Sequence, residues 1–219
     1  MKKALIIFVL LALPITIYII FATAVHHFSY LPIITEDVPH LDRLHTENDA
    51  PIDFNNNVSV LCFYGDEVSK MKGYAYNLHE RIYKKNYIYK DFQIVTIAQK
   101  GQEEEAEQLL KDLGEFTDIN MLKWRFVFLE EDEIHAIFNG LQTDLSLNDK
   151  NATPFAFIID KENNLRGRQD KENGTVDYGY ETGSIAALNN TMVEDVSILL
   201  AEYRLKESRE QNNISKYEK

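Results

Sequence analysis

The hydrophobic and polar positions of the chain change period at one glycine. Residues 58–64 are nearly all β-branched, aromatic or aliphatic, which is typical of a strand buried on both faces. Residues 66–85 instead repeat apolar side chains at helical spacing, and that spacing puts Met71 on the core face. Gly65 permits a tight turn between the two segments, and Asp66 is placed to cap the helix. The predicted fold is organised around this strand-to-helix corner.

Strands and helices continue to alternate along the rest of the chain. Further strands are predicted at 92–98, 121–129, 153–160 and 165–170, and further helices at 102–114, 130–141 and 184–209. The polar, glycine-containing residues 171–183 are expected to form a loop. Helices between strands indicate parallel crossovers, and the late hairpin adds antiparallel pairing. The order β-α-β-α-β-α-β-β-α predicts an α/β, thioredoxin-like domain with a mixed central sheet flanked by helices.

The N-terminus has the pattern of a membrane anchor. Two lysines precede an apolar run over residues 4–24, and about 20 such residues cross a bilayer as a helix. The lysines favour a cytoplasmic N-terminus, so the C-terminal domain is expected on the periplasmic, extracytoplasmic side of a single-pass membrane protein. Ala22-Thr23-Ala24 also fits a signal-peptide cleavage site, although the run is longer than a typical signal-peptide core.

The chain divides into four predicted segments: a transmembrane anchor at 1–25, a juxtamembrane linker at 26–57, a thioredoxin-like domain at 58–209 and a flexible tail at 210–219. The linker carries three of the five prolines and four of the six histidines. Its residues 29–35 are expected to be extended and to pack along the domain, with a turn near residues 41–45.

The charge balance limits the classes of partner. The chain has 35 acidic and 23 basic residues, a net charge of −12. Phosphate recognition needs a basic face, so binding to nucleic acid is excluded. No pattern for a small-molecule substrate or a phosphate loop is present. These exclusions leave a protein as the expected partner.

A single cysteine, Cys62, excludes an intramolecular disulfide. It lies inside the predicted buried strand, where a thiol is expected to be inert. The alternative is a thiol-redox enzyme that uses Cys62, which would require an accessible thiol of low pKa. Asp66 and Glu67 offer a second alternative, an acid–base pair, against the simpler role of capping the helix.

Several segments together resemble the Sco/SenC family of membrane-anchored, thioredoxin-like copper chaperones, which help to build the copper centre of cytochrome oxidase. They are the N-terminal anchor, the corner that ends in Ser69-Lys70-Met71, the strand at 123–129 before a short helix, and the strand at 155–160 followed by Leu-Arg-Gly-Arg at 165–168. The resemblance covers roughly residues 31–203. It implies a proline beside the corner, which Thr153-Pro154 matches, and we expect a cis bond there.

The family's metal ligands are absent from this chain. The resemblance implies two cysteines at the corner, at positions that fall on Gly65 and Ser69, and a histidine near Ala152 or Thr153. Thiolates and imidazole suit copper(I), whereas glycine and serine do not. We therefore expect a degenerate member with no catalytic residues, no metal ligands and no cofactor at this site.

The leading hypothesis is a non-catalytic, membrane-anchored Sco-like protein that acts as an accessory or assembly subunit of a respiratory membrane complex related to cytochrome oxidase. Its partner face is expected at the degenerate site, at Gly65, Ser69 and Pro154, or at a flank of tyrosines within residues 74–89. The alternative is a copper chaperone that uses non-standard ligands. The candidate ligands for it are His26, His27, His40, His45 and Met71.

Overall fold

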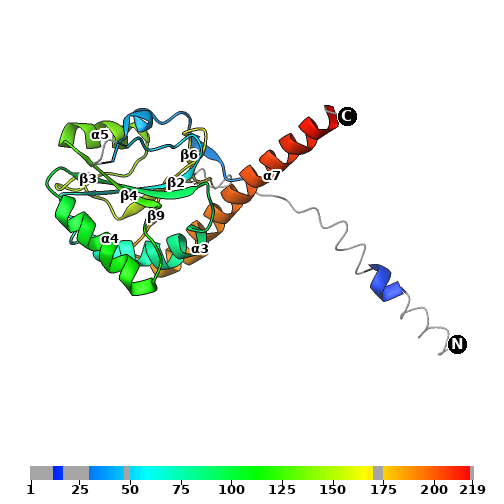
Figure 1. Ribbon diagram of the computed structural model, residues 1–219, viewed down its shortest axis with the longest axis horizontal. Coiled ribbons are helices and arrows are strands. Elements are labelled where there is room, and N and C mark those ends of the chain that lie inside the picture. The colour runs from blue at the N-terminus through cyan, green and yellow to red at the C-terminus, as the bar shows by residue number, and fades with distance from the viewer. Residues whose placement is uncertain (1–11, 17–29, 47–49, 170–174, 218–219) are drawn as a thin grey trace.

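The computed structural model describes residues 12–16, 30–46, 50–169 and 175–217. Its strands are β1 (Ile33–Thr35), β2 (Val58–Gly65), β3 (Phe92–Gln99), β4 (Trp124–Leu129), β5 (Phe155–Ile159), β6 (Leu165–Arg166), β7 (Arg168–Gln169), β8 (Val176–Asp177) and β9 (Tyr180–Glu181). Its helices are η1 (Leu41–Arg43), α2 (Lys72–Leu78), η2 (His79–Tyr83), α3 (Lys84–Asn86), α4 (Glu103–Thr117), α5 (Glu131–Gly140), α6 (Ile185–Ala187), η3 (Leu188–Met192) and α7 (Val193–Tyr217). In Figure 1 the strands form a layer with α5 on one side and α3, α4 and α7 on the other.

The central sheet is mixed, as the sequence predicts. Its order is β1-β6-β5-β2-β3-β4, and β9 also pairs with β5. The pairs β2–β3 and β3–β4 are parallel, whereas β5 is antiparallel to β2, β6 and β9. The strand β2 therefore lies at the centre of the sheet. At Cys62 its neighbours in register are Thr96 on β3 and Ala156 on β5.

The side chains of β2 alternate between two cores. Val60, Cys62 and Tyr64 belong to the core that also contains apolar residues of α2, α4 and α7. Leu61 and Phe63 point to the other face, where apolar residues of α5 cover them. All eight residues of β2 are buried. A strand covered on both faces explains why its sequence is a continuous apolar run.

Part of the segment assigned to the linker belongs to the folded unit. The strand β1 pairs antiparallel with β6, and Gly167 donates a backbone hydrogen bond to the Pro32 carbonyl at 3.1 Å. Leu41 and Phe54 are buried in the core under α5. The extended segment and the turn expected before Val58 are thus present, and they contribute to the core rather than only to a connection.

Four helix or loop boundaries differ from the sequence expectation. A non-helical turn follows β2, so α2 begins at Lys72, and α4 continues past Gly114 to Thr117. The expected loop at 171–183 contains β8 and β9. Strands of two residues are too short to show a hydrophobic periodicity in the sequence. The strand β9 forms by pairing with backbone groups at the start of β5. The helix α7 extends beyond residue 209 to Tyr217.

The predicted transmembrane anchor, residues 1–25, lies mostly outside the described residues. Within it the structure describes a short helix at residues 12–16. Of the helices in the described part of the chain, none has the length and apolar character that a bilayer crossing requires.

Candidate functional site

The corner after β2 is closed by backbone. Gly65 has φ +48°, a left-handed conformation that favours glycine. A Cβ atom at this position would lie 2.0 Å from the carbonyl oxygen of Lys150 and 2.5 Å from the carbonyl carbon of Asn151. The backbone of residues 150–151 therefore occupies the space that a cysteine side chain would need. Gly65 is required by this geometry, and the position has no room for a metal ligand.

Asp66 links the corner to two neighbouring segments rather than capping α2. The N-cap residue of α2 is Met71, without a side-chain capping bond, so the expected capping role of Asp66 is wrong. Lys150 Nζ donates to Asp66 Oδ2 at 3.0 Å, and the Asp66 backbone N–H donates to the Lys150 carbonyl at 2.8 Å. Gln102 Nε2 donates to Asp66 Oδ1 at 3.0 Å, while Gln102 Oε1 accepts from the Val68 N–H at 3.2 Å. The two bonds with Lys150 fasten the covering loop over Gly65, and the two Gln102 bonds hold Asp66 and the turn after it in place.

Glu67 contributes a second set of bonds to the same loop. Lys70 Nζ donates to its Oε1 at 2.6 Å, and Asn148 Nδ2 donates to its Oε2 at 2.9 Å. The hydrogen bonds from Lys70 and then Asn148 lower the pKa of the Glu67 carboxyl below its ordinary value. The Asp66 and Glu67 carboxylates thus bind separate partners. Their positions fit the fastening of a loop and give no geometry for an acid–base pair.

Two other residues of the predicted face lie near this corner. Ser69 is exposed in the turn between β2 and α2. Pro154 immediately precedes β5, and its carbonyl accepts hydrogen bonds from Thr182 through the backbone N–H at 2.9 Å and Oγ1 at 2.6 Å. The backbone N–H of Thr153 donates to the Phe63 carbonyl at 3.0 Å, so β5 starts beside the end of β2. The described residues contain no cis peptide bond, and the expectation of one before Pro154 is wrong.

Cys62 lies within β2 and faces the core. It is about 1% exposed, and burial raises the pKa of its thiol far above the ordinary value, an effect that a hydrogen bond with Thr96 only partly opposes. A buried thiol that stays protonated is a poor nucleophile and a poor metal ligand. This geometry matches the expected inert thiol and offers no support for a redox enzyme that uses Cys62.

The candidate ligands of the alternative copper site are not brought together where the structure describes them. Met71 is buried in the core, as its helical spacing predicts. His45 is exposed, with Nδ1 2.9 Å from the Arg43 carbonyl oxygen, and His40 adopts a left-handed conformation before η1. His26 and His27 lie outside the described residues. Within the described ranges, no three His, Cys, Asp or Glu side chains form a group that could hold a metal ion.

The residues at the degenerate site do not fit copper. Gly65 has no side chain and no space for one, Ser69 offers only a hydroxyl oxygen, and Ala152 and Thr153 stand where the family resemblance implies a histidine. Copper(I) prefers thiolate, thioether and imidazole ligands. No chemical step through a metal is therefore derived for this corner.

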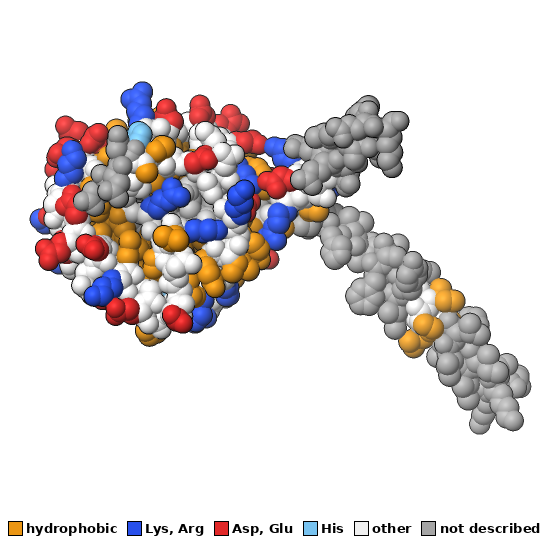
Figure 2. Space-filling model, in the orientation of Figure 1, with side chains coloured by type: hydrophobic (Ala, Val, Ile, Leu, Met, Phe, Trp, Pro, Cys, Tyr) orange, Lys and Arg blue, Asp and Glu red, His pale blue; other side chains and the backbone are white. Residues whose placement is uncertain are grey.

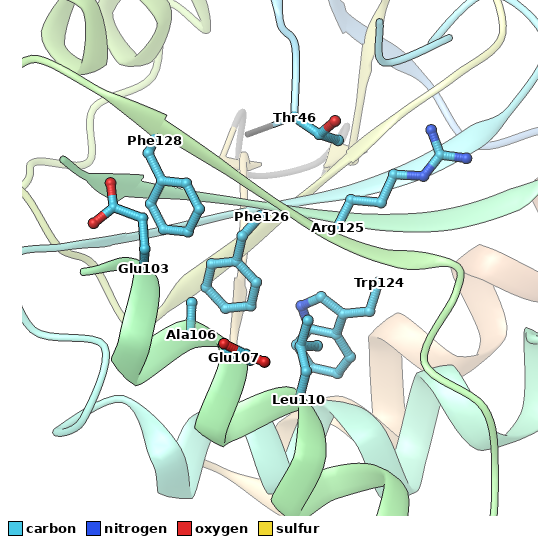
Figure 3. A pocket seen from close by; sticks show the side chains of 9 residues that line it. All are labelled: Thr46, Glu103, Ala106, Glu107, Leu110, Trp124, Arg125, Phe126 and Phe128. Atoms are coloured by element: carbon cyan, nitrogen blue, oxygen red, sulfur yellow. The ribbon is translucent and has the colours of Figure 1, made fainter. Parts of the chain in front are cut away.

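A groove between β4 and α4 was not predicted from the sequence. Figure 3 shows the aromatic side chains of Trp124, Phe126 and Phe128 on one side of the strand, above α4. Glu103 and Glu107 project from α4 beside them. The alternation of aromatic residues at 124, 126 and 128 was visible in the sequence. What the sequence did not show is that β4 is the last strand of the sheet.

Comparison with known proteins places the fold. No family model matches the chain, and no curated protein matches its sequence. Among solved structures, BsSco, a member of the Sco family of cytochrome c oxidase assembly proteins, aligns with a TM-score of 0.51 and 9% identity over 76% of this chain and 95% of that chain. The chain has a thioredoxin-like fold. A candidate protein disulfide isomerase from Bacteroides thetaiotaomicron aligns with a TM-score of 0.50 and 16% identity, over 81% of this chain and 98% of that one.

Proposed function

We propose that this chain is a membrane-anchored, Sco-like protein that acts by binding a partner and not by thiol or copper chemistry. It would serve as an accessory or assembly subunit of a respiratory membrane complex related to cytochrome oxidase. The thioredoxin-like fold and the Sco-family structural neighbour support the scaffold part of this proposal. The anchor and the location of the domain outside the cytoplasm rest on the N-terminal sequence pattern.

The closed corner carries the non-catalytic part of the proposal. Gly65 faces the Lys150 carbonyl at a distance that leaves no space for a Cβ atom. A corner that had only lost its cysteines would keep the space for them. Here the loop at residues 148–153 fills that space and is held by Asp66, Glu67 and Gln99. The position is therefore built as a structural joint.

The partner face is assigned to the surface of this joint. Ser69 and Lys70 are exposed there, and Asp149 is exposed on the covering loop. The alternative face, the tyrosine flank, is less suited to binding because its residues support the core. Tyr83 is buried, and Tyr74, Tyr76, Tyr87 and Tyr89 pack against the core as partly buried side chains.

The copper-chaperone alternative predicts a metal held by linker histidines. Met71 is unavailable to it without unfolding of the core, since its side chain is buried. Replacement of His40 and His45 by alanine in the full chain, followed by metal analysis, tests the remaining described ligands. A metal content that falls with these substitutions would support this alternative.

Recovery of the partner from membranes tests the leading proposal. The tagged full chain is isolated from detergent-solubilised membranes, and co-purified respiratory subunits are quantified against an untagged control. We expect oxidase-related subunits in the wild-type sample and a roughly tenfold loss with Ser69→Arg, because a large side chain on a binding surface weakens the complex. Ser197→Arg, at an exposed position on α7, is the matched control and should have no effect. Absence of any respiratory subunit would contradict the proposal.

A further inference from the structure

The strand β4 forms an edge of the sheet that the described strands make. The sheet order ends at β4, and no described strand pairs with it on the side away from β3. The Lys123 carbonyl accepts from the Ile94 N–H and the Leu129 carbonyl accepts from the Lys100 N–H. Because peptide groups alternate in direction along a strand, those of Phe126 and Phe128 face outward. They form a row of donors and acceptors without a strand partner.

This edge carries little of the protection that exposed edges usually have. Natural sheets shield their edges with very short strands, charged side chains or prolines. The opposite edge, β1, has only three residues, whereas β4 has six residues, with no proline and with Arg125 as its one charged residue. The rings of Phe126 and Phe128 stack at 6.1 Å, and Leu122, just before the strand, is 79% exposed. In Figure 2 hydrophobic side chains gather where Figure 1 places β4 and α4.

The α4 side of the groove carries negative charge. Glu103 and Glu107 line it, one helical turn apart on α4. Glu103 Oε2 accepts a hydrogen bond from the Gly101 N–H at 2.9 Å, and no described lysine or arginine forms an ion pair with Glu107. A chain that lay along β4 would place alternate side chains over these carboxylates. Basic side chains at those positions would complement the charge.

We propose that the β4 edge binds an extended segment of a partner protein, which adds to the sheet as a further strand. Its backbone pairs with Phe126 and Phe128, its apolar side chains pack on the partly buried Phe128 ring, and a lysine or arginine lies against Glu103 and Glu107. This is the strand-addition mode of peptide recognition. A second copy of the chain is a poorer occupant. Antiparallel pairing of two β4 edges would place both acidic α4 helices on the same face.

This inference does not rest on the membrane anchor or on a respiratory partner. It is tested by selecting binders from a displayed library of random twelve-residue peptides against the purified full chain in detergent. We expect enriched peptides with lysine or arginine alternating with apolar residues. The best peptide should bind Glu107→Lys roughly tenfold more weakly than wild type, because a charge pair at an interface becomes a repulsion. Glu104→Lys is the matched control, an exposed residue of α4 that does not line the groove, and should change binding less than twofold.

Two further readouts separate strand addition from other contacts. Amide hydrogen exchange at Phe126 and Phe128 should slow when the peptide binds. N-methylation of the peptide amides on one edge should abolish binding, whereas N-methylation on the other edge should preserve it. No enriched peptide, equal binding to the Glu107→Lys and Glu104→Lys variants, or unchanged exchange would overturn the proposal. Exchange protection that rises with protein concentration in the absence of peptide would overturn it in favour of a dimer of this chain.

Discussion

The corner after β2 and the edge of β4 differ in how their backbone hydrogen-bonding groups are satisfied. At the corner, the Asp66 N–H donates to the Lys150 carbonyl, and side-chain bonds with Asp66, Glu67 and Gln99 hold the covering loop. At the edge, the peptide groups of Phe126 and Phe128 face outward, and none of the described strands pairs with them. The position where the family resemblance implies chemistry is closed by the protein itself. The position that the resemblance does not mark is open.

This difference shows where binding energy is available. Polar groups that are already satisfied within a fold gain little from a ligand, because the exchange of one hydrogen bond for another contributes little net free energy. The edge can gain backbone bonds along its outer side together with further burial of the partly buried Phe128 ring. The corner is thus suited to holding the fold and presenting a surface, and the edge to taking up an extended segment.

The largest expected effect concerns Cys62, three residues before the corner. Its thiol should react with iodoacetamide at least about a thousandfold more slowly in the folded chain than in urea, since reaction requires opening of a stable fold. Mass spectrometry of the alkylated protein over time measures both rates. Rapid labelling of the native chain would show that the region of the corner is accessible. The corner would then not differ from the β4 edge in accessibility.

Substitution of Gly65 should give the next largest effect. Gly65→Ala should lower the free energy of unfolding by about 3 kcal/mol or more, because its Cβ meets the Lys150 carbonyl and its φ is positive. Urea denaturation followed by circular dichroism measures the change. Gly73→Ala is the matched control, since a Cβ at Gly73 in α2 meets nothing within 4 Å, and it should be neutral or stabilise by about 1 kcal/mol. Equal stability of the two variants would mean that the corner has room for a side chain.

Gln102 provides a smaller test of the same joint. Gln102→Ala removes the bonds to Asp66 and to the Val68 N–H, and should lower the free energy of unfolding by about 1 to 2 kcal/mol. Hydrogen exchange should also become faster at residues 66–68. Gln108→Ala, which loses only a bond to Asp112 on the same helix, should cost less. Unchanged exchange at the corner would show that Gln102 does not hold it.

The smallest effect is a pH dependence near the start of β4. His79 is buried and stacks on Trp124. Burial is the largest cause that lowers the pKa of its imidazole below the ordinary value. The charge of Glu80 raises this pKa and that of Lys84 lowers it, both by less than burial does. The unfolded chain therefore takes up a proton first as the pH falls below about 6.5. The contribution of neutral His79 to stability should be present at pH 7.5 and decrease toward pH 5. Urea denaturation of wild type and His79→Gln at both pH values measures it, and an identical pH response of the two would contradict the assignment.

Much of the fold was predictable because its strands and helices carry their own periodicity. The segments around Val58, Phe92, Trp124 and Phe155 formed strands where their apolar runs predicted them. The strand β9 could not be predicted, because it depends on a free backbone edge that β5 provides only in the folded chain. The start of α2 was misplaced because Asp66 can form either a helix cap or bonds to a distant loop, and the sequence does not show Lys150 or Gln102 beside it.

The candidate site was predictable in one respect and not in another. The absence of cysteine and histidine at Gly65, Ser69, Ala152 and Thr153 could be read directly from the sequence. The closure of the corner could not, since the contact joins Gly65 to residues 150–151. The open edge of β4 is also a property of strand order. A strand at the centre of the sheet could have had the same aromatic alternation.

Copper(I) titration of the full chain in detergent tests the central claim, that the corner is closed to the chemistry of the family it resembles. The protein is titrated under reducing conditions in competition with a strong copper(I) chelator, and bound copper is measured per chain. The closed corner predicts that the chain keeps no stoichiometric copper. Tight binding of one copper per chain that persists when His26, His27, His40 and His45 are all replaced by alanine would contradict the claim.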